Sequence, residues 1–212
     1  MTQKIAVIVP FASLKLGFWY HLLEAEQNGQ HQIEDLDFYH FGLLAPKIHQ
    51  DDVWTDKDFS FVAKMRNLLI RFALDNFNLD WFFIVDDDVL LNPLIFRYFF
   101  SKPDGAKAIG FHHYSFEFHR DLVTQQTPDQ LGYFERVGQT VLYKNKSLYD
   151  RLPDDIYPDQ TYLVAADVIE EIGKRTRDKW FAGQWEARWF VEKVREITPW
   201  YMCDVNNYAD FK

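Results

Sequence analysis

Two kinds of apolar pattern alternate along the first half of the chain. Residues 4–9 and 81–85 form short runs rich in β-branched and aromatic side chains, which are typical of buried strands. Residues 58–78 instead repeat their apolar positions every three or four residues, from Val62 to Ala73. That spacing predicts a helix with one buried face.

The same patterns, read with the turn residues, predict the remaining elements. Ser13 and Asp167 are predicted to cap the N-termini of two helices, and Asn92-Pro93 is predicted to start another. Asn28-Gly29 is predicted to end the helix that Ser13 begins. The predicted helices are residues 13–28, 58–78, 92–100, 167–175 and 184–196. The predicted strands are residues 4–9, 33–41, 81–85, 106–111, 137–143, 161–165 and 200–205, with a loop over residues 42–55.

Strands and helices alternate through the first half, while short strands dominate the second. This order predicts an α/β fold with a mostly parallel sheet flanked by helices and a smaller antiparallel part in the second half. A chain of 212 residues is expected to form one domain, residues 1–212.

Composition and charge exclude some classes of protein and disfavour others. Hydrophobic residues make up 48% and charged residues 26% of the chain, as in ordinary globular proteins. The net charge of −9 disfavours nucleic-acid binding through the overall field, and the single Cys203 excludes an intrachain disulfide and a cysteine-rich zinc site. The apolar run Ile5–Val9 is too short for a membrane span, so we expect a cytoplasmic protein.

Three consecutive acids, Asp86, Asp87 and Asp88, directly follow the apolar strand at residues 81–85. In an open α/β sheet, ligands bind beyond the carboxyl ends of the strands. Adjacent carboxylates repel one another unless a cation binds them, and carboxylate oxygens suit Mg²⁺ or Mn²⁺. Because such ions commonly complete their shell with phosphate oxygens, the trio predicts a substrate that contains a diphosphate.

The order of these segments resembles the nucleotide-sugar glycosyltransferases of the GT-A fold. The resemblance rests on the first strand ending at Pro10, on KMRNLLIRFAL with its Arg66-Asn67 pair, and on WFFIVDDDVLLNP with its Asp-x-Asp motif. It covers residues 4–113, and residues 161–205 more loosely. It implies a GT-A-like (Rossmann-like) domain, with a nucleotide-sugar-binding half (1–113) and an acceptor-binding half (114–212).

The resemblance also implies roles for the acids. Asp88 would bind the Mn²⁺ or Mg²⁺ that holds the donor diphosphate, and Asp86 would contact the ribose or share the metal. Asp87 would lie beside the donor. Asp204, after the last predicted strand, is the best match for a further metal ligand of the family.

Nucleotide contacts and catalysis fall on other segments. Pro10 and Phe11 would lie near the nucleobase, and Arg66 and Asn67 near the nucleotide. In the matching late segment, DKWFAGQWEARWFVEKVRE, Glu186 is the candidate base that takes the proton of the acceptor hydroxyl.

Asp178 is the second candidate base. Trp180, Phe181 and Trp185 could stack on an acceptor sugar or base, and His112-His113 could face the same crevice. The implied partners are a nucleotide-diphosphate sugar and a hydroxyl acceptor, which could be a glycan, a lipid-linked sugar, a protein or a modified nucleic acid.

Three other functions also agree with parts of the sequence. A phosphatase of the haloacid-dehalogenase type also carries Asp-x-Asp after an apolar strand, but normally on its first strand. A sugar nucleotidyltransferase shares the sheet topology but needs a Gly-rich, basic loop, of which FASLKLG is a poor version. A non-catalytic module that binds sugar nucleotides would use the same acids without turnover.

Overall fold

Three parallel strands form the part of the sheet that comes from the first half of the chain. The computed structural model describes residues 2–11, 16–32, 35–44, 56–87, 89–115, 146–158, 161–183 and 186–209. In it, β1 (Gln3–Phe11) lies between β2 (Leu36–Leu44) and β3 (Trp81–Ile84) and runs parallel to both. Every residue of β3 is buried, as expected for a central strand covered on both faces.

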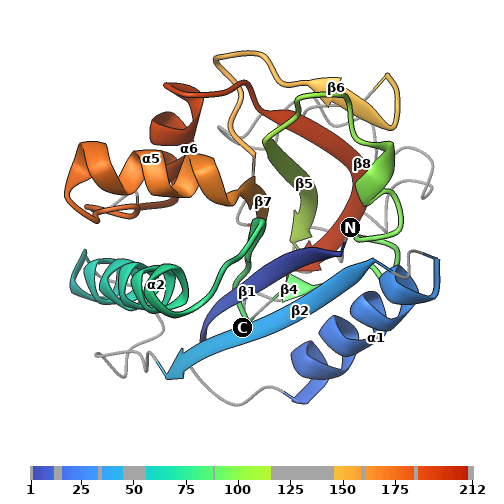
Figure 1. The fold of residues 1–212 in the computed structure, drawn as a ribbon, viewed down its shortest axis with the longest axis horizontal. Helices are drawn as coiled ribbons and strands as arrows, with labels where there is room; N and C mark the ends of the chain where they lie inside the picture. The colour runs from blue at the N-terminus through green and yellow to red at the C-terminus, as the bar shows by residue number, and fades with distance from the viewer. Residues whose placement is uncertain are drawn as a thin grey trace.

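Two helices connect these strands and lie on opposite sides of them. Helix α1 (Leu16–Gln32) joins β1 to β2, and α2 (Asp56–Asn76) joins β2 to β3. Figure 1 shows α1 on one side of the β1–β2 pair and α2 on the other. Since β2 and β3 flank β1, the order of the strands reverses at β1. Open α/β sheets commonly bind ligands at such a reversal, beyond the carboxyl ends of the strands, which here are those of β1 and β3.

The rest of the sheet is mixed. Beyond β3, the strand order is β7, β5, β8 and β4, with β6 paired to β8, so the described residues form one eight-stranded sheet. The β3–β7, β5–β7, β4–β8 and β6–β8 pairs are antiparallel, and β5–β8 is parallel. The strands are β4 (Val89–Leu90), β5 (Ala108–Ser115), β6 (Tyr149–Arg151), β7 (Tyr162–Ala165) and β8 (Tyr201–Ala209).

Two further helices lie on the same side as α2 (Figure 1). Helix α5 (Ala166–Thr176) follows β7 directly, and α6 (Glu186–Arg195) follows after a short connecting segment. Trp180 and Trp200 are fully buried, and their indole N–H groups donate to the carbonyls of Ile169 (2.7 Å) and Val191 (3.0 Å). These aromatic side chains therefore pack α5 and α6 onto the sheet.

The α/β fold class predicted from the sequence is confirmed, including the antiparallel part of the second half. Four of the five predicted helices and most predicted strands are present, with ends shifted by a few residues. The predicted strand at residues 137–143 and the cap at Ser13 lie outside the described residues. The two-residue β4 and three-residue β6 were too short to be predicted.

Four local predictions are wrong. Helix α1 continues past Gly29, which lies against Phe96 where a Cβ would approach that side chain to 2.9 Å. The predicted loop at Gly42 begins as strand, because the end of β2 pairs with the end of β1. Residues 92–100 form turns and a short 3₁₀ helix, η1 (Phe99–Ser101), and Asp167 lies in the first turn of α5 after the N-cap Ala165.

Candidate active site

The acidic segment begins where β3 ends. The Val85 N–H donates to the carbonyl of Ile8 (3.1 Å), so the chain still follows β1 at that point. Val89 N–H then donates to the carbonyl of Asp86 (3.3 Å), which closes a tight turn. Asp86 is partly exposed, with 20% of its side chain accessible, and Asp87 is buried. Asp88 lies outside the described residues.

Pro10 and Phe11 extend β1 beyond its last pair with β3. Ile8 pairs with Ile84, so the same register continued places Pro10 level with Asp86. The ring of Phe11 packs edge-on against Trp19, at 6.3 Å between centroids. Both predicted donor-binding segments thus reach the same end of the sheet.

Arg66 connects this turn to helix α6. It lies in α2, is only 4% exposed, and its two terminal nitrogens donate to different carboxylates. Nη2 donates to Oδ1 of Asp86, and Nη1 donates to Oε1 of Glu186. One guanidinium therefore joins the end of β3 to the first residue of α6, two positions that are 100 residues apart in the sequence (186 − 86).

A ring lies against the same guanidinium. The Arg66 Cζ is 4.9 Å from the ring centroid of Phe181, within the range of a cation–π interaction. The ring of Phe181 also stacks on Phe190 of α6, at 4.5 Å and 13°. The predicted stacking of Trp180 and Phe181 on an acceptor sugar or base finds no support in the structure, because both side chains are 1% exposed and belong to the core. Trp185, the third residue of that prediction, lies outside the described residues.

The charges of this cluster shift the affinity of its members for protons. Burial opposes the charge of Arg66, but the charges of Asp86 and Glu186 and their hydrogen bonds outweigh it and raise the pKa of Arg66. Burial raises the pKa of Glu186, and the charge of Asp86 raises it further, against the lowering effect of Arg66. One cation shared by two carboxylates does not fully compensate the burial of Glu186.

Two polar atoms of the cluster are buried without a hydrogen-bond partner in the part of the chain that the structure describes. They are Nε of Arg66 and Oε2 of Glu186. Buried polar atoms are nearly always paired, so an unpaired carboxylate oxygen next to a charged cluster is an expected feature of a reactive site.

Asn67 follows Arg66 in α2 and contacts Phe181 through two hydrogen bonds. Its Nδ2 donates to the carbonyl of Phe181 (2.8 Å), and its Oδ1 accepts from the N–H of Phe181 (2.8 Å). The sequence indicated that Asn67 belongs to the site, but Phe181 as its backbone partner had no sequence signal.

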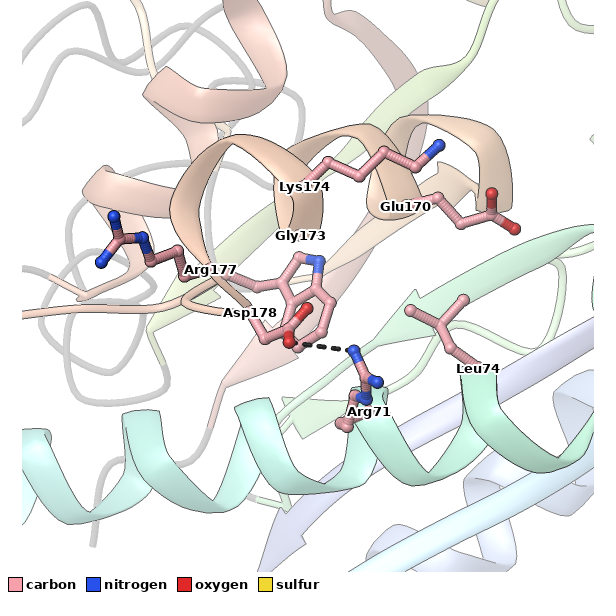
Figure 2. Close-up of a pocket in the computed structure, with 8 residues that line it drawn as sticks. Arg71, Leu74, Glu170, Gly173, Lys174, Arg177 and Asp178 are labelled. Atoms are coloured by element: carbon pink, nitrogen blue, oxygen red, sulfur yellow. Dashed lines mark hydrogen bonds and ion pairs between the residues drawn. The ribbon is translucent and has the colours of Figure 1, made fainter.

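Asp178 does not join the cluster in the described structure. Its side chain is 46% exposed and pairs with Arg71 (2.9 Å), farther along α2. The two residues border an open hollow of about 520 Å³ between α2 and α5, together with Gly173 and Trp180. Figure 2 shows the Arg71–Asp178 pair crossing this hollow, while Lys174 and Arg177 point in different directions.

Asp204 and the two histidines lie on neighbouring strands, β8 and β5. Asp204 is exposed, its N–H donates to the carbonyl of Leu148 (2.9 Å), and β8 meets β4 only from Tyr208 on. The structure therefore does not place Asp204 next to Asp86. His112 and His113 pair with β8 in β5, and their side chains lie outside the described part.

The described residues do not by themselves form a metal centre. No group of three His, Cys, Asp or Glu side chains among them could hold a metal ion. Asp86 nevertheless fits a metal site, because among the described residues the bond from Arg66 goes to its Oδ1 and the side chain remains partly exposed, two positions before Asp88 in the sequence. A single free carboxylate oxygen suits Mg²⁺ or Mn²⁺ that keeps other positions for substrate oxygens.

Comparisons with known proteins establish the fold. No protein-family model and no curated protein matches the chain. Its structure is similar to A197 from STIV (12% identity, TM-score 0.50, 96% of this chain and 82% of that one). It is also similar to S. aureus TarS (13% identity, TM-score 0.51), covering 99% of this chain and 37% of TarS. At such low identity the likeness shows the fold alone, which is GT-A-like.

No helix in the described ranges combines the length and the apolar character that a bilayer crossing would require.

Proposed function

We propose that the protein is a metal-dependent glycosyltransferase that moves a sugar from a nucleotide-diphosphate donor to an acceptor hydroxyl. The observation that carries the proposal is the buried Arg66, which binds Asp86 at the end of β3 and Glu186 at the start of α6. The GT-A-like fold supports it, because the cluster lies at the carboxyl end of β3, and open α/β sheets bind ligands beyond the carboxyl ends of their strands.

The donor would bind along the carboxyl ends of β1 and β3. Pro10 and Phe11 would border the nucleobase, and the free oxygen of Asp86 would contact the ribose or the metal. Asp88 would be the main metal ligand, with Asp87 beside it. The bound Mn²⁺ or Mg²⁺ would neutralise the charge that develops on the departing diphosphate.

Glu186 would act as the base in an inverting displacement. The acceptor oxygen bonds to the anomeric carbon, the bond from that carbon to the diphosphate oxygen breaks, and Glu186 takes the hydroxyl proton. Arg66 holds Oε1, so Oε2 is the atom that would accept the proton. Because Oε2 is buried, this role requires the acceptor to displace the atoms that cover it.

Asp178 and Asp204, the remaining predicted site residues, lie outside the Arg66–Asp86–Glu186 cluster. Asp178, paired with Arg71 on the surface, is a weaker candidate for the base than Glu186. Asp204 would be a further metal ligand, as the resemblance implies. The acceptor class and a cytoplasmic location stay predictions from the sequence.

Binding of the donor tests the proposal without any knowledge of the acceptor. We expect one member of a nucleotide-sugar panel to raise the melting temperature when Mn²⁺ is present, and to do so much less with a chelator. At a hundredfold excess over Kd the stabilisation is about 2.7 kcal/mol, which is several degrees for a domain of this size. Asp88→Asn should lose the metal-dependent shift.

Asp37→Asn is the matched control, since Asp37 is an exposed acid on β2. It should keep the full shift. A panel in which no nucleotide sugar stabilises the wild-type protein, with either metal, would contradict the proposal.

A further inference from the structure

The segment between α5 and α6 adopts an unusual backbone. Arg177 and Asp178 have positive φ angles of 54° and 62°, which side chains other than glycine rarely adopt. Such conformations cost free energy and persist only where neighbouring groups hold them. Phe181 follows three residues after Asp178, and Glu186 five residues after Phe181.

Asn67 is one of the groups that hold this segment. Its amide makes both hydrogen bonds of the Phe181 backbone, at 2.8 Å each, and so replaces the partner that a β-ladder would supply. The preceding residue, Trp180, is held by the hydrogen bond from its indole N–H to the carbonyl of Ile169. The segment is thereby attached to α2 at one point and to α5 at another.

The position of Phe181 determines the surroundings of Arg66. Its ring lies 4.9 Å from the guanidinium carbon and stacks on Phe190, one turn into α6. Arg66 in turn holds Oε1 of Glu186. A shift of Phe181 would therefore move the ring against Arg66 and the start of α6 together.

We infer that Asn67 is a positioning residue: its two bonds to Phe181 fix the Arg66–Glu186 pair in the geometry that proton removal from the acceptor requires. The part of this inference that concerns catalysis rests on the proposed function. In this role Asn67 acts through Phe181, to which both polar atoms of its amide bond. This differs from the nucleotide contact that the sequence predicted.

Asn67→Ala tests the inference by separating turnover from donor binding. We expect kcat to fall on the order of tenfold to a hundredfold, as for other misplaced catalytic groups, while KM for the donor changes by less than about twofold. Asn76→Ala is the matched control. Asn76 lies in the same helix and donates to the carbonyl of Phe72 at the same 2.8 Å, but it is exposed and distant from the site.

Asn67→Asp adds a pH-dependent readout. An ionised carboxylate accepts from the Phe181 N–H but donates nothing to its carbonyl, whereas the protonated acid does both. The ratio of variant to wild-type kcat should therefore rise as the pH falls. A role in stability alone would lower the melting temperature without moving this ratio. Should Asn67→Ala fail to fold, Asn67→Asp carries the test.

Carboxyl titration by carbon NMR tests whether Asn67 positions the Arg66–Glu186 pair, and it needs no enzymatic activity. The Glu186 signal is assigned through its loss in Glu186→Gln. Its titration midpoint should differ from that of the wild type in Asn67→Ala and equal it in Asn76→Ala. If the wild type turns over no nucleotide sugar, the proposed function fails, yet this titration still tests the positioning role of Asn67. Wild-type kcat, or a wild-type Glu186 titration, in Asn67→Ala would overturn the inference.

Discussion

The burial of the charged Arg66 side chain costs free energy, which its neighbours must offset. A guanidinium removed from water loses several kcal/mol of hydration. It is repaid here by two carboxylates and one aromatic ring, which contact it from the end of β3, from α6 and from the segment before α6. Removal of one partner from such a buried cluster typically costs about 3–5 kcal/mol. The cluster therefore joins these three parts of the fold as well as forming the site.

Glu186→Gln should change how stability depends on pH. The folded protein raises the pKa of Glu186 above its ordinary 4.5, so the folded state binds this proton more tightly than the unfolded chain. Linkage then requires wild-type stability to fall as pH rises from about 4.5 through the raised pKa. The free energy of unfolding of Glu186→Gln, relative to wild type, should therefore increase over that interval in urea titrations.

Glu192 provides a control of opposite sign on the same helix. Its hydrogen bond from Arg188 is the largest influence and lowers the pKa, so its contribution to stability is lost only as pH falls below the ordinary range. Glu192→Gln should thus show no rise relative to wild type above pH 4.5. A flat difference for Glu186→Gln across the same interval would contradict the raised pKa.

Sequence reasoning located the cluster but not its connections. Asp86 follows from its position directly after an apolar strand, whereas the roles of Arg66 and Glu186 were implied by the resemblance to GT-A glycosyltransferases. Nothing local to Arg66 indicates that it is buried or that it bridges two carboxylates, because both partners come from segments distant in the sequence. Phe181 contacts Asn67 through its backbone, which any residue could provide.

At the scale of elements, close packing fixes the segment that leads to Glu186. A Cβ at Gly173 would lie 2.8 Å from Cζ2 of Trp180 and 3.1 Å from Oδ1 of Asp178. The ring of Trp180 cannot retreat easily, because it is buried and bonded to Ile169. Gly173 thus allows α5 to approach the segment closely.

Gly173→Ala should destabilise the protein although alanine favours helices. The helix propensity gains roughly 1 kcal/mol, while the overpacked contact with Trp180 costs about 1–3 kcal/mol and displaces the segment. We expect a net loss in urea unfolding and a weaker Glu186-dependent activity. Lys174→Ala, an exposed neighbour in the same helix, should stay within about 0.5 kcal/mol of wild type. A Gly173→Ala protein as stable as wild type would show that the contact relaxes freely.

The elements that sequence patterns missed share one cause. Helix α1 continues past Gly29, where the absence of a side chain lets the helix pack closely against Phe96. The turn residues Asn92 and Pro93 do what was expected locally, since Asn92 Oδ1 accepts from the Leu94 N–H (2.9 Å), but no α-helix follows. Short strands such as β4 exist only through their partner β8. Local signals set the starts of elements, and long-range pairing sets their extent.

At the scale of the whole molecule, the topology explains why the site lies where it does. The order β2-β1-β3 brings the ends of β1 and β3 together, so Pro10 and Asp86 each follow two residues after the last β1–β3 pair, Ile8 with Ile84, although they are far apart in sequence. Antiparallel β7 then places α5 and α6 on the same side as α2, where Glu186 reaches Arg66 (Figure 1). Alternating strands and helices predicted the parallel pairing but not the strand order, and nothing in the sequence specified the position of α5 and α6.

The products of turnover distinguish the proposed transferase from its rivals. A phosphatase would release inorganic phosphate, a nucleotidyltransferase would exchange pyrophosphate, and a binding module would release nothing. A glycosyltransferase without its acceptor commonly transfers sugar to water slowly and frees the nucleoside diphosphate. The product therefore reports the reaction class even while the acceptor is unidentified.

The most direct measurement is the release of nucleoside diphosphate from a panel of nucleotide sugars, by wild type and by Asp88→Asn, with Mn²⁺ and with a chelator. The account predicts release by the wild type with Mn²⁺, and loss of release with the chelator and in the variant at an unchanged melting temperature. Equal release by Asp88→Asn, or no release from any donor by the wild type, would contradict it.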